Sequence, residues 1–196
     1  MNLPNKLTIS RIILTFIFIF LIKTNGLFSK SAAVAVFAIA CMTDWVDGYL
    51  ARKKKEVTVF GKLMDPIADK VLVISAFVAF SQLGLVAVWM VAIILVREFI
   101  VTGLRIFALA KGKVIAAHPL GKHKTVSSYI AIFLIMGFLI FKEIAGNMNF
   151  YSATFDKIGI GTIYIFMLVV ILFTIISGAN YIIRNAFLLR ELKTEE

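Results

Sequence analysis

Long apolar runs alternate with short polar stretches along this chain, and the alternation predicts six membrane-spanning helices. The apolar runs cover about residues 12–22, 31–50, 66–83, 85–110, 127–141 and 158–189. A helix of about 20 apolar residues is long enough to cross the hydrocarbon core of a bilayer. The last run exceeds that length, so its helix should tilt or extend beyond the membrane. The predicted fold class is therefore an all-α integral membrane protein with six transmembrane helices.

The ends of these runs carry further signals. The first residues, MNLPNKLTISRI, mix polar and apolar side chains and predict an N-terminal interfacial amphipathic segment. A signal peptide is the alternative, but no small-residue cleavage site follows the run, and Lys23-Thr-Asn-Gly is typical of a turn. Pro66 is expected at a helix start, which makes Asp65 a candidate N-cap. Phe141 to Lys157 is expected to be the longest polar connection on its side.

Composition supports a membrane protein. Hydrophobic residues make up 61% of the 196 residues and charged residues only 16%, whereas soluble domains are about 45–50% apolar. This length suits a single membrane-embedded domain over residues 1–196, without an appended soluble domain. Cys41 is the only cysteine, so an internal disulfide is excluded.

The formal net charge of +10 indicates topology and an anionic partner rather than nucleic acid. Six spans place both termini and two inter-helix loops on one side, which carries Lys6, Arg52, Lys53, Lys54, Lys55, Lys62, Lys111, Lys113, Lys122, Lys124, Arg184, Arg190 and Lys193. The opposite side carries Lys23, Lys30, Lys142 and Lys157. Because basic loops stay in the cytoplasm, we expect a multi-pass protein of the cell membrane with both termini cytoplasmic.

Four carboxylates at the ends of two apolar runs predict a metal site. Spacing of i, i+3, i+4 and i+7 places one stripe on a single helix face, namely Asp44, Asp47, Gly48 and Ala51. A second stripe repeats every four residues, namely Gly61, Asp65 and Asp69. If the polar hinge Arg52–Phe60 reverses the chain, both stripes meet in one cavity. Clustered carboxylates in an apolar protein repel one another and lose hydration, so they need hard divalent cations.

A second candidate site consists of cations in or near the later spans. Arginine at membrane depth is costly and usually marks a function or an ion pair, and guanidinium groups suit phosphate oxygens. We therefore expect a cytoplasmic-side pocket for the phosphate of an acceptor, formed by Arg97, Arg105, Lys122, Lys124 and Arg184. The alternative is local pairing of the arginines with carboxylates, together with lysines that reach towards the interface.

The central spacing, D-x2-D-G-x2-A-R-x8-G-x3-D-x3-D, matches at every fixed position the signature of the CDP-alcohol phosphotransferase family, which this chain resembles. The likeness to the bacterial members that use glycerol 3-phosphate extends over NLPNKLTISRI, VTVFGKLMDPIADK, REFIVTGLR and GKHKT. Met64 stands where Leu is usual, a volume-conserving difference. The resemblance implies a membrane homodimer that displaces CMP from CDP-diacylglycerol with sn-glycerol 3-phosphate.

The resemblance also implies roles for individual residues. Two divalent ions, Mg²⁺ or Mn²⁺, would be held by Asp44, Asp47, Asp65 and Asp69, and Asp69 would also be the general base. Residues implied to bind the CDP-lipid are Asn5, Thr8, Arg11, Gly48, Ala51, Arg52 and Gly61. Two structural alternatives stay open. The small residues would then pack helices together, and the residues before the first span would cap and anchor it.

Two functional alternatives also remain. The same chemistry could use another acceptor, such as inositol phosphate or phosphatidylglycerol. Buried carboxylates also line ion pathways, so a divalent-cation transporter is the alternative from another class. Carboxylates at one membrane face rather than the midplane, and the lack of a visible inverted repeat, argue against transport.

Overall fold

The structure is a computed structural model that describes residues 3–54, 59–110, 119–148 and 151–185, with side chains described for residues 9–43, 70–108, 121–148 and 151–185. Within these ranges the chain forms six helices and no strand, so the all-helical prediction is confirmed. The helices are α1 (Leu3–Lys23), α2 (Leu27–Lys54), α3 (Val59–Gln82), α4 (Val88–Ala110), α5 (Pro119–Asn147) and α6 (Ala153–Arg184).

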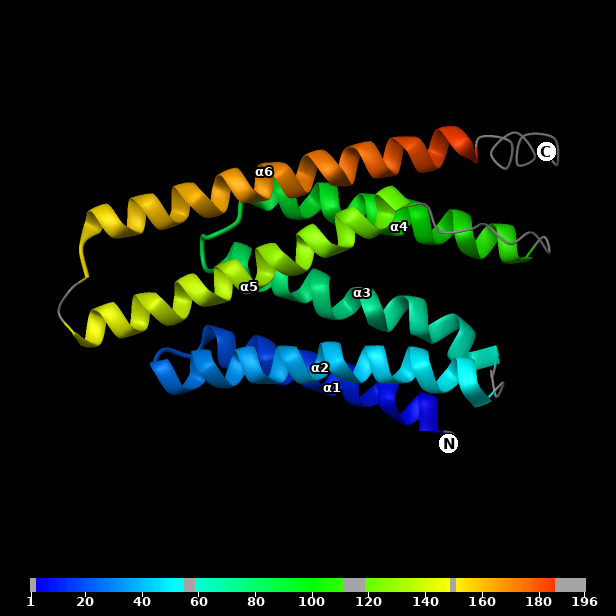
Figure 1. Cartoon of the computed structure of the whole chain (residues 1–196), viewed down its shortest axis with the longest axis horizontal. Coiled ribbons are helices and arrows are strands. Elements are labelled where there is room, and N and C mark those ends of the chain that lie inside the picture. Colours follow the sequence, from blue (N-terminus) through cyan, green and yellow to red (C-terminus); the bar gives the residue numbers. More distant parts are fainter. Residues whose placement is uncertain (1–2, 55–58, 111–118, 149–150, 186–196) are drawn as a thin grey trace.

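Successive helices run in opposite directions, so the first and last residues that the structure describes, at the start of α1 and the end of α6, lie at the same end of the bundle (Figure 1). Helix α1 packs against α2 and α3, and α6 packs against α4 and α5. Helix α3 joins the two groups because it also contacts α4 and α5. The end of α2 and the start of α3 therefore lie at the same end of the bundle as the end of α4 and the start of α5 (Figure 1).

Short turns join the helices at the opposite end. Gly26 and Gly84 have φ angles of 107° and 73°, a left-handed conformation that glycine adopts without steric cost. The Lys30 ammonium donates to the Ile22 carbonyl at 2.6 Å and so satisfies a backbone group near the end of α1. Ser152 caps α6 by accepting a hydrogen bond from the Phe155 N–H at 3.3 Å.

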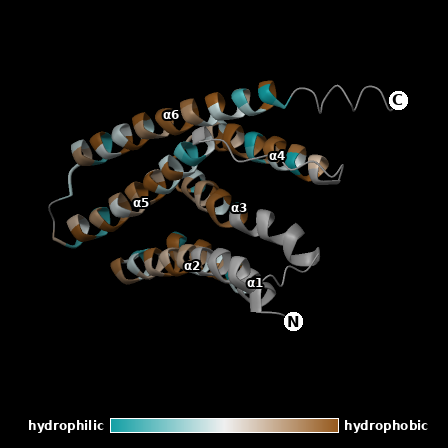
Figure 2. Cartoon of the chain, turned by 45° about the vertical axis from the view of Figure 1, so that its right-hand side comes forward, coloured by the Kyte–Doolittle hydropathy of each residue, from teal (hydrophilic) through white to brown (hydrophobic). Residues whose placement is uncertain are grey.

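Apolar side chains occupy both the interior and the outer surface of the bundle. The interior includes Phe18 and Phe37, which are fully buried with ring centroids 5.3 Å apart. Outward-facing Phe20 and Phe28 are 71% and 85% exposed. Soluble proteins rarely expose large contiguous apolar surfaces. Hydrophobic colouring covers most of the described helices, while polar residues gather towards the end of the bundle that holds the termini (Figure 2).

Two segments are long and apolar enough to cross a membrane, Gly121–Asn147 in α5 and Ala153–Arg184 in α6. Leu27–Thr43 and Lys70–Gln82 form shorter apolar helices. Length and composition in the described residues thus support membrane association, in agreement with the predicted class.

The helix boundaries correct three predictions, which concern the start of α3, the hinge between α2 and α3, and the connection between α5 and α6. Pro66 lies seven residues inside α3 instead of at a helix start, so the prediction that Asp65 is an N-cap was wrong. The predicted hinge Arg52–Phe60 is too long, because α2 continues to Lys54 and α3 begins at Val59. The connection predicted over 141–157 is shorter, since α5 continues to Asn147 and α6 begins at Ala153. The predicted N-terminal segment and first span form one helix, α1.

The α5–α6 contact generates a stability prediction. A Cβ at Gly159 would overlap the ring of Phe138, which packs against Phe155. Gly159→Ala should therefore destabilise the protein by about 1–3 kcal/mol, the usual cost of overpacking. Thermal unfolding of purified protein in detergent measures this change.

Gly161→Ala is the matched control, because a Cβ at Gly161 meets no atom within 4 Å. It should be neutral or slightly stabilising, since alanine favours a helix over glycine by about 1 kcal/mol. Equal unfolding temperatures for the two variants would contradict the close approach of α5 and α6.

Candidate active site

The four predicted metal ligands lie on α2 and α3 at matching distances from the helix ends. Asp44 and Asp47 are on α2, which ends at Lys54, and Asp65 and Asp69 are on α3, which begins at Val59. With a rise of about 1.5 Å per residue, Asp44 and Asp69 each lie about 15 Å from those ends, and Asp47 and Asp65 about 10 Å. Because the two helices run in opposite directions from the same connection, Asp44 and Asp69 lie at one level along the bundle, and Asp47 and Asp65 lie at another (Figure 1).

The predicted nucleotide-binding residues occupy the same part of the bundle. Gly48, Ala51 and Arg52 are on α2, and Gly61 is on α3. Their side chains, and those of the four aspartates, lie outside the described side chains, so their meeting in one cavity stays a prediction.

Helix α1 carries Asn5, Thr8 and Arg11. Only the Arg11 side chain is within the described range, and it is 3% exposed. Because α1 packs against both α2 and α3, Arg11 is buried on the helix that contacts both acidic helices. A position inside the bundle does not suit an interfacial anchor, and the binding role of Arg11 stays a prediction.

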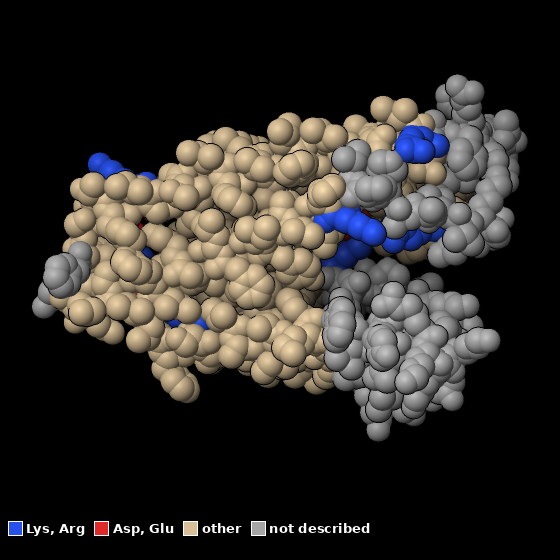
Figure 3. All heavy atoms as spheres, in the orientation of Figure 1, with Lys and Arg blue, Asp and Glu red and all other residues tan. Residues whose placement is uncertain are grey.

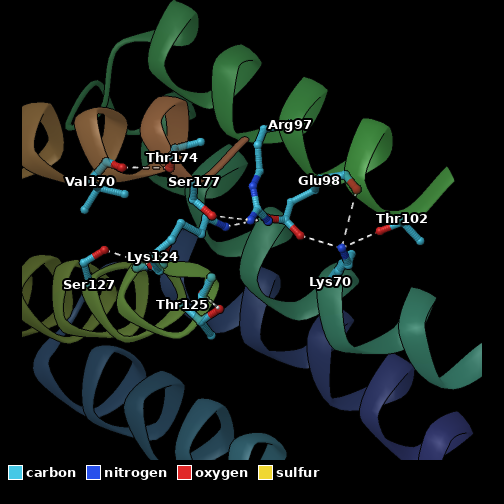
Figure 4. Close-up of polar contacts among 12 residues, drawn as sticks. Lys70, Arg97, Glu98, Thr102, Lys124, Thr125, Ser127, Val170, Thr174 and Ser177 are labelled. Atoms are coloured by element: carbon cyan, nitrogen blue, oxygen red, sulfur yellow. Dashed lines mark hydrogen bonds and ion pairs between the residues drawn. The ribbon is translucent and has the colours of Figure 1, made fainter. Parts of the chain in front are cut away.

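The most densely charged group of described side chains is centred on Glu98, in the middle of α4. One oxygen, Glu98 Oε1, lies 2.7 Å from Arg97 Nη1 and 2.6 Å from Lys124 Nζ. The other, Glu98 Oε2, lies 2.6 Å from Lys70 Nζ. Figure 4 shows the three cations converging on this carboxylate from α3, α4 and α5. We call Lys70, Arg97, Glu98 and Lys124 the Glu98 cluster.

The Glu98 cluster is shielded from solvent. The side chains of Lys124, Glu98 and Arg97 are 5%, 11% and 13% exposed, and that of Lys70 is 26% exposed. Lys70 also contacts the Thr102 hydroxyl one turn along α4 from Glu98. In such surroundings ion pairs are screened weakly, so removal of one partner would leave an uncompensated charge at high cost.

Helix α6 orients Arg97. The guanidinium donates from Nη2 to the Ser177 hydroxyl at 2.8 Å. A Cβ at the next residue, Gly178, would lie 3.1 Å from Arg97 Cγ, so glycine leaves the room in which the arginine lies. The Arg97 side chain is thus held between its ion pair with Glu98 and the surface of α6 (Figure 4).

The predicted acceptor-phosphate residues are only partly brought together. Arg97 and Lys124 meet through Glu98, while Arg105, Lys122 and Arg184 are exposed and lie outside the Glu98 cluster. The alternative of local pairing is confirmed for Arg97, whose carboxylate partner is its own neighbour. Lysine and arginine side chains nevertheless gather at one end of the molecular face in Figure 3, beside the part of the chain whose side chains are not described.

The prediction from sequence missed Lys70, Glu98, Thr102 and Ser177. A signal for Glu98 was present, because a lone acid within an apolar helix needs a cationic partner. Lys70 also follows Asp69 directly in the sequence. Thr102 and Ser177 carried no distinguishing signal, since hydroxyl groups in apolar helices usually bond to their own backbone, as Thr174 does with the Val170 carbonyl at 2.7 Å.

The Glu98 cluster, together with the acidic positions on α2 and α3, fits an enzyme that handles phosphate groups next to a membrane. Residues 1–155 match the CDP-alcohol phosphatidyltransferase family, and the chain belongs to this family. It is therefore a transferase of phospholipid synthesis. Enzymes of this family generally depend on a divalent metal.

Relatives extend the likeness over nearly the whole chain. A CDP-diacylglycerol–glycerol-3-phosphate 3-phosphatidyltransferase of Bacillus subtilis (strain 168) is 37% identical, covering 94% of this chain and 95% of its own. Enzymes with the same name from Rickettsia typhi and Escherichia coli (strain K12) are 39% and 36% identical, over 83% and 78% of this chain and 94% and 86% of theirs.

The contact between α4 and α6 gives a testable prediction. Ser177→Ala removes the hydroxyl that accepts from Arg97. We expect a loss of about 1–2 kcal/mol in unfolding free energy, since the lost hydrogen bond joins two helices at a buried point and involves a charged group. Thermal unfolding in detergent is the measurement.

Thr174→Val serves as the control one turn away on α6, because its hydroxyl bonds only within its own helix among the contacts described. This variant should be close to neutral. A Ser177→Ala protein as stable as Thr174→Val would show that the Arg97–Ser177 hydrogen bond contributes nothing.

Proposed function

We propose that this protein transfers the phosphatidyl group of CDP-diacylglycerol to sn-glycerol 3-phosphate, giving phosphatidylglycerophosphate and CMP. The observation that carries the proposal is the 37% identity, over 94% of the chain, to an enzyme named for this reaction. The cationic Glu98 cluster supports a phosphate-bearing acceptor, since it offers buried guanidinium and ammonium groups in one place.

The donor set on α2 and α3 fits divalent cations. Four carboxylates at two matching levels of these helices offer the hard oxygen ligands that Mg²⁺ or Mn²⁺ prefers. Asp44, Asp47, Asp65 and Asp69 would hold two such ions. When bound, these ions would neutralise the pyrophosphate of the CDP-lipid and the departing CMP.

The chain's own residues would then act as follows. Asp69 accepts the proton of the acceptor hydroxyl as that oxygen attacks the phosphorus of the phosphatidyl group, and CMP leaves with the bridging oxygen. Gly48, Ala51 and Gly61 leave room for the nucleotide against the helix backbones. Arg52 on α2, with Asn5, Thr8 and Arg11 on α1, would bind its phosphates and base.

The acceptor phosphate would be bound by Arg97 and Lys124 within the bundle. The exposed residues Arg105, Lys122 and Arg184 would attract it from the cytoplasm. Steering of this kind raises the local concentration of an anionic substrate and weakens with salt.

We further propose that residues 1–196 form one membrane-embedded domain with six spans, which associates as a homodimer. Support for six spans comes from the antiparallel order of the six helices and from their exposed apolar faces (Figure 1). The distribution of Lys and Arg along the sequence favours a cytoplasmic position for both termini and for the active site.

The reaction is tested by CMP release from CDP-diacylglycerol, using purified protein in detergent with Mg²⁺ or Mn²⁺. Glycerol 3-phosphate, inositol phosphate, serine and phosphatidylglycerol are compared as acceptors. Release should require glycerol 3-phosphate and a divalent ion. Asp69→Asn should lower the rate by at least about a hundredfold, because a general base contributes about 10²–10⁴-fold.

Each other outcome has a definite meaning. Release with a different acceptor would keep the family chemistry and overturn the proposed substrate. No metal-dependent release with any acceptor would overturn the proposed reaction. Metal flux into proteoliposomes without CDP-lipid would then support the transporter alternative.

The topology is tested separately by labelling single cysteines in intact cells, in a Cys41→Ser background. Asn25→Cys and Asn147→Cys lie at the end of the bundle opposite the termini, and Lys122→Cys lies at the end that holds the termini; all three positions are exposed. A membrane-impermeant thiol reagent should label the first two in intact cells, and Lys122→Cys only after the membrane is opened. The reverse pattern would contradict the proposed orientation.

A further inference from the structure

We propose that Glu98 is a positioning residue for the acceptor phosphate: its carboxylate holds Lys70, Arg97 and Lys124 together so that their unused donors and excess positive charge bind a phosphate monoester. This inference rests on the proposed function and assigns a role to a residue that does not itself contact the substrate.

Charge provides the first argument. Among the described side chains, the Glu98 cluster contains three cations and one carboxylate, so two positive charges are uncompensated. Uncompensated charge at low exposure is costly unless an anion joins it. A phosphate monoester carries about −1.5 to −2 charges at pH 7, which matches the excess. A phosphodiester or an uncharged alcohol would leave part of it unmatched.

Hydrogen-bonding capacity provides the second argument. An ammonium has three donors and a guanidinium has five. The described contacts of Lys124 Nζ use one donor, to Glu98. Arg97 donates from Nη1 to Glu98 and from Nη2 to Ser177, and its buried Nε has no hydrogen-bond partner among the described residues. Donors therefore remain on both cations after Glu98 has bound them.

Position in the fold provides the third argument. Glu98 connects three helices, because Lys70 is on α3, Arg97 is its neighbour on α4, and Lys124 is on α5 (Figure 4). Lys70 directly follows Asp69, the proposed base, in α3. The contact between Glu98 and Lys70 therefore also fixes α3 beside α4, at the residue next to the proposed base. Through these contacts Glu98 would place the acceptor phosphate relative to the reacting hydroxyl.

The test compares Glu98→Gln with wild type, since glutamine keeps the size of the side chain and removes its charge. The KM for glycerol 3-phosphate should rise by about ten- to a hundredfold, by analogy with residues that orient metal ligands without contacting the metal, while the KM for CDP-diacylglycerol should change little. Without CDP-lipid, the rise in unfolding temperature that glycerol 3-phosphate gives the wild type should be lost in Glu98→Gln.

Asp156→Asn is the matched control, because it removes the carboxylate of the Lys142–Asp156 ion pair at the opposite end of the bundle. It should leave the KM for glycerol 3-phosphate unchanged. If Glu98→Gln cannot be purified folded, Glu98→Asp carries the test, since it keeps the charge but shortens its reach. Glu98→Asp should raise the same KM by a smaller factor.

The outcomes separate this inference from the proposed function. If wild type releases CMP with glycerol 3-phosphate, an unchanged or lowered KM for this acceptor in both Glu98 variants overturns the inference, because Glu98 would then compete with the phosphate or only support the fold. An equal rise in both KM values would also overturn it. A wild-type enzyme without glycerol 3-phosphate-dependent release fails the proposed function instead.

Discussion

The bundle depends on one carboxylate that binds three cations in a largely shielded position. Glu98 contacts Lys70, Arg97 and Lys124 at 2.6–2.7 Å, so a single side chain links α3, α4 and α5, and Arg97 continues the link to Ser177 on α6. Ions in apolar surroundings have no solvent to replace a lost partner, and removal of one member of a buried pair commonly costs about 3–5 kcal/mol. Apolar packing gives the helices affinity for one another without direction, whereas these contacts select which faces meet.

The apolar surface of the protein leaves close packing and polar contacts to decide which helix faces meet. Outward side chains such as Phe28 and Phe99 are 85% and 67% exposed, which suits hydrocarbon and not water. Between membrane helices the hydrophobic effect gives no preference for protein over lipid, so close packing and polar contacts must decide the arrangement. Gly159 against Phe138 and Gly178 against Arg97 are two such close approaches. Both involve α6, whose outer face is largely exposed.

The sequence predicted the helices well and the cation contacts poorly, for physical reasons. Apolar runs reveal helices because each span must be apolar along its own length, independently of its neighbours. The helix start predicted at Pro66 was wrong. The missing N–H of proline suits a helix start, but α3 begins at Val59 and tolerates the lost hydrogen bond inside the helix. The aspartates could be singled out because four acids at fixed offsets are improbable by chance. Glu98 and Ser177 were missed because they contact partners 26 to 80 residues away in the sequence. The spacing of residues along one helix cannot predict such long-range contacts.

The acidic positions and the Glu98 cluster lie on different helices of the bundle, except that both include α3. The acidic positions lie on α2 and α3, and the basic cluster lies on α3, α4 and α5, so α3 belongs to both. The change from acid to base occurs between two consecutive residues, Asp69 and Lys70. The proposed transfer between two anionic substrates would need both kinds of group, because a purely basic site would bind both phosphates without distinguishing them, and a purely acidic site would repel the acceptor. In the proposed reaction, carboxylates would serve the pyrophosphate of the CDP-lipid and the Glu98 cluster would serve the acceptor phosphate, so α3, which carries members of both groups, would keep the two phosphates apart with the reacting hydroxyl between them.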